Sequence, residues 1–169
     1  MSKLSNLFAK KNKTFSVQMF GKLPLYKDFI SMLSEKESMI WRELLLKKFK
    51  NNLNFSQKYT PFIFKPAQKK LIVGIIENSS DGIREFPFSL FVLLSNDYLF
   101  IPVWDALKRI RVELETINDI DELYHVLQGK TLQLESEKNE LCQNLPDLSI
   151  KDLFICTDTD NWKWEILTF

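Results

Sequence analysis

The amino-acid sequence predicts one α/β domain, built as a three-layer α/β/α sandwich around a mixed and mostly buried sheet. A length of 169 residues fits a single domain, and an apolar content of 45% with 14 Phe can fill a dense core. Residues 71–76 and 86–94 are apolar almost throughout, which is typical of strands buried on both faces. Such strands need helices above and below them.

The first half of the chain begins with residues 1–13, whose Lys, Ser and Asn predict a flexible lead, so the domain covers residues 14–169. The capping-box pair Ser34 and Glu37 predicts a helix over residues 35–53. Its apolar residues share one face. The other expected elements are a strand at 15–20, a loop at 21–24, a short strand or helical turn at 27–32, and strands at 61–64 and 71–76 around a turn at 65–67.

The second half predicts a buried strand over residues 86–94 and then two helices. Pro102 suits the first residue of the first helix, and Asp119 with Glu122 suits the cap of the second. Residues 129–149 fit a loop or a loose helix. Closing strands are expected at 153–156 and 164–167, around an Asx-type turn at 158–161 that lacks the Gly and Glu of a calcium loop.

Few residues could carry catalysis or hold a metal. Cys142 and Cys156 lack the spacing of a zinc site or a disulfide framework, and Cys156 is expected to be a buried thiol, which suits a reducing compartment. A hydrolase would need the single histidine, His125, beside Ser79 or Ser80, and this is the least favoured function. The sequence therefore predicts no enzyme, no cofactor and no metal.

The charge is divided unevenly along the chain. Residues 1–70 are strongly basic and residues 71–169 strongly acidic, although the net charge is +1. Either the two halves fold together and their charges intermix, or a basic and an acidic face steer a charged protein partner. Nucleic acid is not an expected partner, because acidic residues would compete with the basic surface. With neither a signal peptide nor a membrane-length apolar run, a cytoplasmic location is predicted.

Residues 20–29 and 79–87 mark two places where the backbone turns sharply after a strand. We expect these two loops to meet at one edge of the sheet, because loops on a rigid scaffold commonly carry recognition. Within the second loop, Asp81 and Arg84 are spaced for a local ion pair that stabilises the turn. The alternative is that Arg84 faces an acidic or phosphorylated partner.

These two loops resemble the signatures of the TagF (ImpM) family, which accompanies bacterial type VI secretion systems. The matching segments are Gly21-Lys22-Leu23-Pro24, Lys27-Asp28-Phe29, Trp41, Gly74-Ile75, Asn78-Ser79-Ser80-Asp81 and Arg84-Glu85-Phe86-Pro87-Phe88. Lys27 and Asn78 replace a usual Gly and Pro, and Ile83 stands where the family has Gly in a loop one residue longer. The candidate partner-binding or motif residues are Gly21, Lys22, Pro24, Asp28, Phe29, Trp41, Ser79, Asp81, Arg84 and Pro87.

The resemblance implies a three-layer α/β fold without enzymatic activity. It further implies a cytoplasmic regulatory adaptor that represses type VI secretion after translation, by binding a scaffold protein with a forkhead-associated domain. The alternative is a constitutive structural or assembly component of the secretion apparatus. Under either interpretation the expected partner is a protein.

Overall fold

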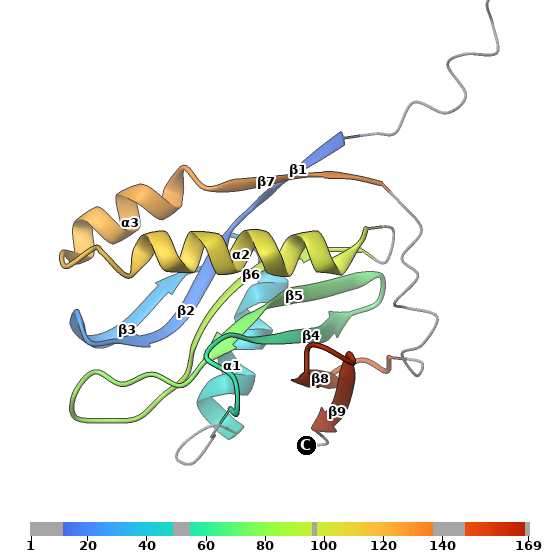
Figure 1. Cartoon of the computed structure of the whole chain (residues 1–169), viewed down its shortest axis with the longest axis horizontal. Helices are drawn as coiled ribbons and strands as arrows, with labels where there is room; N and C mark the ends of the chain where they lie inside the picture. The colour runs from blue at the N-terminus through green and yellow to red at the C-terminus, as the bar shows by residue number, and fades with distance from the viewer. Residues whose placement is uncertain (1–11, 49–54, 96–97, 137–147, 168–169) are drawn as a thin grey trace, which may run out of the picture.

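The structure is a computed structural model that describes residues 12–48, 55–95, 98–136 and 148–167 (Figure 1). Nine strands and three helices lie within these four ranges. In chain order they are β1 (Asn12–Ser16), β2 (Gln18–Leu23), β3 (Tyr26–Met32), α1 (Lys36–Lys48), β4 (Thr60–Ala67), β5 (Lys70–Glu77), β6 (Phe88–Leu94), α2 (Phe100–Leu114), α3 (Ile120–Gln128), β7 (Thr131–Glu135), β8 (Leu153–Asp158) and β9 (Lys163–Leu167).

The centre of the fold is a seven-stranded sheet with the strand order β3-β2-β6-β5-β4-β8-β9. Each neighbouring pair in it is antiparallel. A separate antiparallel ladder joins β1 to β7. The strands β2, β6 and β5 lie side by side, so the β2–β3 turn and the β5–β6 loop emerge at the same end of the sheet.

The predicted three-layer α/β/α sandwich around a mixed sheet is wrong, because the described chain is mostly β and its sheet is antiparallel throughout. As predicted, residues 71–76 and the strand β6 are fully buried, but burial does not determine strand direction. Two residues connect β4 to β5, and no helix lies between β5 and β6. A parallel crossover needs a dozen or more residues, so these connections dictate antiparallel pairing.

Side chains that alternate along the strands build two separate apolar cores, one on each face of the sheet. Trp41 and Leu45 of α1 pack into one core. Trp104 and Leu107 of α2 pack into the other, and Figure 1 shows the strands lying between these two helices. An ion pair of 2.6 Å from Arg111 Nε to a Glu77 oxygen also ties α2 to the end of β5.

The ends of several elements differ from the prediction. The expected first strand is divided between β1 and β2, and residues 12 and 13 of the expected lead belong to β1, while residues 1–11 lie outside the described residues. The first helix is described to Lys48, and residues 49–53 lie outside the described residues. The expected turn at 65–67 falls at 68–69.

Residues 129–149 include the strand β7, with residues 137–147 outside the described residues. The cap of α3 is confirmed, because the Asp119 carboxylate accepts the backbone N–H of Glu122 at 2.9 Å. Among the described residues, no helix combines the length and the apolar character needed to cross a membrane.

Candidate functional site

The first of the two loops is the end of the β2–β3 hairpin, where β3 forms an edge of the sheet. The ladder pairs Gly21 with Ile30 and Leu23 with Tyr26, so the register shifts around Lys22. Residues 27–29 of β3 therefore oppose Lys22 alone, and the strand bulges there. This bulge brings the backbone carbonyl of Lys27 within hydrogen-bond distance of the Arg84 side chain in the second loop.

The second loop, residues 79–87, is folded around the side chain of Asp81. Its Oδ1 accepts the backbone N–H groups of Ile83 at 2.9 Å and Arg84 at 2.7 Å, which makes an Asx-type turn. Gly82 has a φ of 85°, a conformation that favours glycine. The Asp81 N–H donates in return to the Arg84 carbonyl at 3.3 Å. Asp81 thus fixes the shape of the loop.

A buried ion pair joins the two loops. Lys22 Nζ lies 2.5 Å from Asp81 Oδ2, and the two side chains are 1% and 0% exposed. The same ammonium donates to the Lys27 carbonyl at 3.0 Å and lies 4.5 Å from the centre of the Phe29 ring. The hydrogen bond from Lys22, together with N–H groups of the loop, holds the pKa of the Asp81 carboxyl well below its usual range. The loops are therefore tied by a charged contact at neutral pH.

Arg84 extends from this network toward solvent. Its Nη2 donates to the Lys27 carbonyl at 3.0 Å and lies 3.3 Å from Asp81 Oδ2, while 59% of the side chain is exposed. The predicted pair between Arg84 and Asp81 is thus confirmed as a local contact. Arginine carries five N–H donors, so most of this guanidinium can still meet a carboxylate or phosphate from a partner.

Aromatic and backbone packing supports the contact between the loops. The rings of Phe20, Phe29 and Phe86 form a cluster with centroid separations of 4.8 to 6.0 Å. Gly21 has a φ of 145°, and a Cβ at this position would lie 2.2 Å from the carbonyl oxygen of Pro87. The absence of a side chain at Gly21 therefore lets β2 and the second loop approach this closely.

Trp41 supports β2 from inside the protein. It is fully buried and stacks on Phe62 with 4.4 Å between ring centres. Its Nε1 donates to Ser89 Oγ at 3.1 Å, and that hydroxyl donates to the Phe20 carbonyl at 3.1 Å. Trp41 contributes to the fold in this conformation and has no surface to offer a partner.

The two loops meet, as the sequence predicted, but the candidate residues divide into buried and exposed groups. Lys22 and Asp81 are buried, and the Ser79 carbonyl accepts the Phe86 N–H at 2.9 Å as part of the loop's own structure. Asp28 is exposed and makes no hydrogen bond or ion pair within the described residues. It lies in the bulge of β3 next to Lys27, whose carbonyl accepts a hydrogen bond from Arg84.

We use the name rim for five residues at the surface of these loops: Pro24, Tyr26, Asp28, Ile83 and Arg84. Tyr26 is 44% exposed and Ile83 is 71% exposed. Sequence reasoning did not select either as a binding residue. The sequence did contain an indication of both residues, because large apolar side chains in otherwise polar loops often mark contact surfaces.

The remaining candidates lie elsewhere. His125 is exposed on α3, and no hydrogen bond within the described residues joins it to Ser79 or Ser80. Cys156 is buried as expected, and burial raises the pKa of its thiol. The turn at 158–161 is of the predicted Asx type, since Asp158 Oδ1 accepts two backbone N–H groups. No group of metal-ligating side chains occurs among the described residues.

The uneven charges of the two halves meet at two contacts, one buried and one at the surface. Lys22 pairs with Asp81, and Lys58 lies 2.7 Å from Glu115. Each pair joins the basic first half of the sequence to its acidic second half. The hydrogen bond to Glu115 raises the pKa of Lys58 to about 12. These two contacts join charges of the two halves, whereas the other ion pairs described each lie within one half.

No protein-family model and no curated protein matches this chain. Among solved structures, the chain is similar to PA0076 from Pseudomonas aeruginosa PAO1, known from a crystal structure at 2.05 Å resolution. The identity is 16%, the TM-score is 0.48, and the match covers 68% of this chain and 62% of PA0076. This chain therefore spans less than two thirds of that protein, and the likeness carries no inference about function.

Proposed function

We propose that this chain is a non-enzymatic, cytoplasmic adaptor that represses type VI secretion by binding a protein of the secretion system through the rim. A scaffold with a forkhead-associated domain is the partner that the TagF resemblance implies. The supporting observation is the contact between the two TagF-like loops. Lys22 and Asp81, which belong to different signatures, form a buried support, and Arg84 of the rim contacts Asp81 and extends to the surface.

The chemistry of the rim suits a protein partner. Ile83 offers an exposed aliphatic side chain, and Tyr26 offers an exposed ring. Arg84 follows Ile83 in the loop and presents an exposed guanidinium. An apolar anchor beside a cation is a common arrangement at the centre of protein interfaces. It would fit a partner surface that has an apolar pocket next to a carboxylate or phosphate.

Co-purification from the native bacterium tests the proposal with two rim variants, Ile83→Asp and Arg84→Glu. Matched controls are Val112→Asp and Arg109→Glu, because Val112 is 52% exposed and Arg109 is exposed, both on α2 away from the rim. Both rim variants should lose the partner while remaining folded, with the melting temperature unchanged in Ile83→Asp and lowered in Arg84→Glu by the new carboxylate beside Asp81, and the α2 variants should retain the partner. Unchanged capture by both rim variants would overturn the proposal.

The same experiment separates regulation from a constitutive role. A repressor should hold its partner when secretion is off and release or exchange it when secretion is on. If the chain retains the same apparatus protein in both states, the structural or assembly role is the better account. The partner is identified from what the wild-type chain captures and the rim variants lose.

A further inference from the structure

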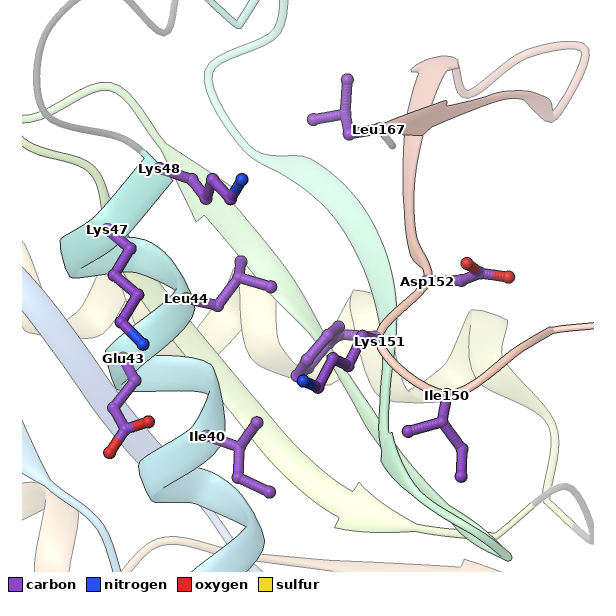
Figure 2. A pocket seen from close by; sticks show the side chains of 10 residues that line it. Ile40, Glu43, Leu44, Lys47, Lys48, Ile150, Lys151, Asp152 and Leu167 are labelled. Atoms are coloured by element: carbon purple, nitrogen blue, oxygen red, sulfur yellow. The ribbon is translucent and has the colours of Figure 1, made fainter. Parts of the chain in front are cut away.

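A pocket of about 490 Å³ lies beside α1 and includes none of the rim residues. It occupies the face of the sheet that α1 covers, between this helix and the segment that leads into β8 (Figure 2). Its volume falls in the range typical of small-molecule sites, roughly 300–1,000 Å³. The lining residues are Ile40, Glu43, Leu44, Lys47, Lys48, Phe64, Ile150, Lys151, Asp152 and Leu167.

The backbone that carries Lys151 is held in place by β4. Lys151 has a φ of 74°, which is uncommon for a residue with a long side chain. Its N–H donates to the Lys65 carbonyl at 2.8 Å, and the Lys65 N–H donates to the Asp152 carbonyl at 3.2 Å. These two bonds fix the unusual backbone conformation. They leave the Lys151 side chain over the pocket, as Figure 2 shows.

The charged side chains around the pocket favour an anion. Lys48 and Lys151 extend toward it from opposite walls (Figure 2). The Asp152 carboxylate points away and accepts a backbone N–H of its own turn at 2.7 Å. Lys151 has no carboxylate partner within the described residues. The Lys151 ammonium is therefore the cationic group at which an anion in this pocket would sit.

The interior of the pocket favours an apolar body on that anion. Ile40 and Leu44 line the helix side, and Leu167 lines the opposite side (Figure 2). Burial of aliphatic carbon against such side chains contributes about 0.8 kcal/mol per CH₂ group in general. We propose that this pocket binds a small amphipathic carboxylate, such as a medium-chain fatty acid, with its head at Lys151 and its tail against Ile40 and Leu44.

Titration of the purified chain with sodium decanoate, followed by calorimetry and by NMR shifts, tests this proposal. Decanoate should bind saturably, and decyltrimethylammonium, which has the same tail and the opposite charge, should not. Lys151→Asn should weaken decanoate binding about tenfold, because it removes one charge-assisted hydrogen bond. Asn tolerates a positive φ, so the turn should persist.

Lys69→Asn is the matched control, because Lys69 is also an exposed lysine with a positive φ, at 59°, and it does not line the pocket. This variant should bind decanoate like the wild type, as should the rim variant Arg84→Glu. Leu44→Trp should obstruct the apolar wall of the pocket and weaken decanoate binding. Equal binding of the cationic detergent, unchanged affinity in Lys151→Asn, or binding of an acidic peptide in place of decanoate would each overturn the proposal. None of these outcomes bears on the rim.

Discussion

Lys22 and Asp81 lie 59 positions apart in the sequence, yet their ammonium and carboxylate are 2.5 Å apart in the interior of the protein. Residues of the two loops therefore have different roles. Lys22 and Asp81 shape the loops, and their exposed neighbours are available for contact with a partner. A buried ion pair is weak evidence for net stability, since desolvation offsets much of its attraction. Its clearest effect is to specify how the two loops fit together.

Replacement of Lys22 by Met should destabilise the protein strongly. The change removes one member of the pair and leaves the Asp81 carboxylate buried without its cation. The melting temperature, measured by circular dichroism, should fall by several degrees or more. The double variant Lys22→Met/Asp81→Asn should recover part of the loss, because the neutral amide keeps an acceptor for the Asx-type turn. Losses that simply add in the double variant would show that the two side chains are not coupled.

The stability of the protein should decline in acid partly because of Asp81. The pKa of this carboxyl is depressed in the folded state, chiefly by Lys22. Its contribution is therefore complete above the unfolded pKa of about 3.9 and is lost progressively as the pH falls toward the folded pKa. Urea unfolding between neutral pH and about pH 3 should show a smaller acid decline in Asp81→Asn than in the wild type. Parallel declines would assign the acid sensitivity to other carboxyls.

Gly21→Ala and Gly82→Ala should differ in their effects, although both glycines have a positive φ. A Cβ at Gly21 would lie 2.2 Å from Pro87 O and 2.5 Å from Phe88 Cα, both backbone atoms. We expect a loss of about 3 kcal/mol or more, from overpacking combined with backbone strain. A Cβ at Gly82 meets nothing within 4 Å, so strain alone should cost about 1–2 kcal/mol. Urea unfolding measures both, and equal losses would contradict the close approach at Pro87.

The sequence contained enough to locate most strands and to predict that the loops meet, but not the direction of the strands. Apolar runs such as residues 71–76 report burial, and burial is the same in parallel and antiparallel sheets. The short connection of two residues between β4 and β5 indicates strand direction better than burial does, because it is too short for a parallel crossover. The strand β7 was missed although Leu132 and Leu134 alternate with polar residues, because its partner β1 lies more than a hundred positions away in sequence.

The burial of Lys22 was beyond a sequence argument. Lysine is almost never fully buried without a partner, and nothing near Lys22 in the chain reveals a partner 59 positions away. The exposed Ile83 was noticed only as a departure from a family pattern. In the structure it is the most exposed of the large apolar side chains described. Functional surfaces formed by contacts between distant segments become visible only once those contacts are known.

Two substitutions at Trp41 should separate packing from hydrogen bonding beneath the first loop. Trp41→Ala empties a fully buried site against Phe62 and should cost about 3–5 kcal/mol. Trp41→Phe keeps an aromatic ring and loses the donor to Ser89, so a cost of about 1–2 kcal/mol is expected. Ser89 retains its own bond to the Phe20 carbonyl, so β2 should keep its position. Urea unfolding followed by circular dichroism gives both losses, and partner capture should survive in Trp41→Phe. If that variant stays folded but loses the partner, Trp41 contributes to binding in a way that its burial does not explain.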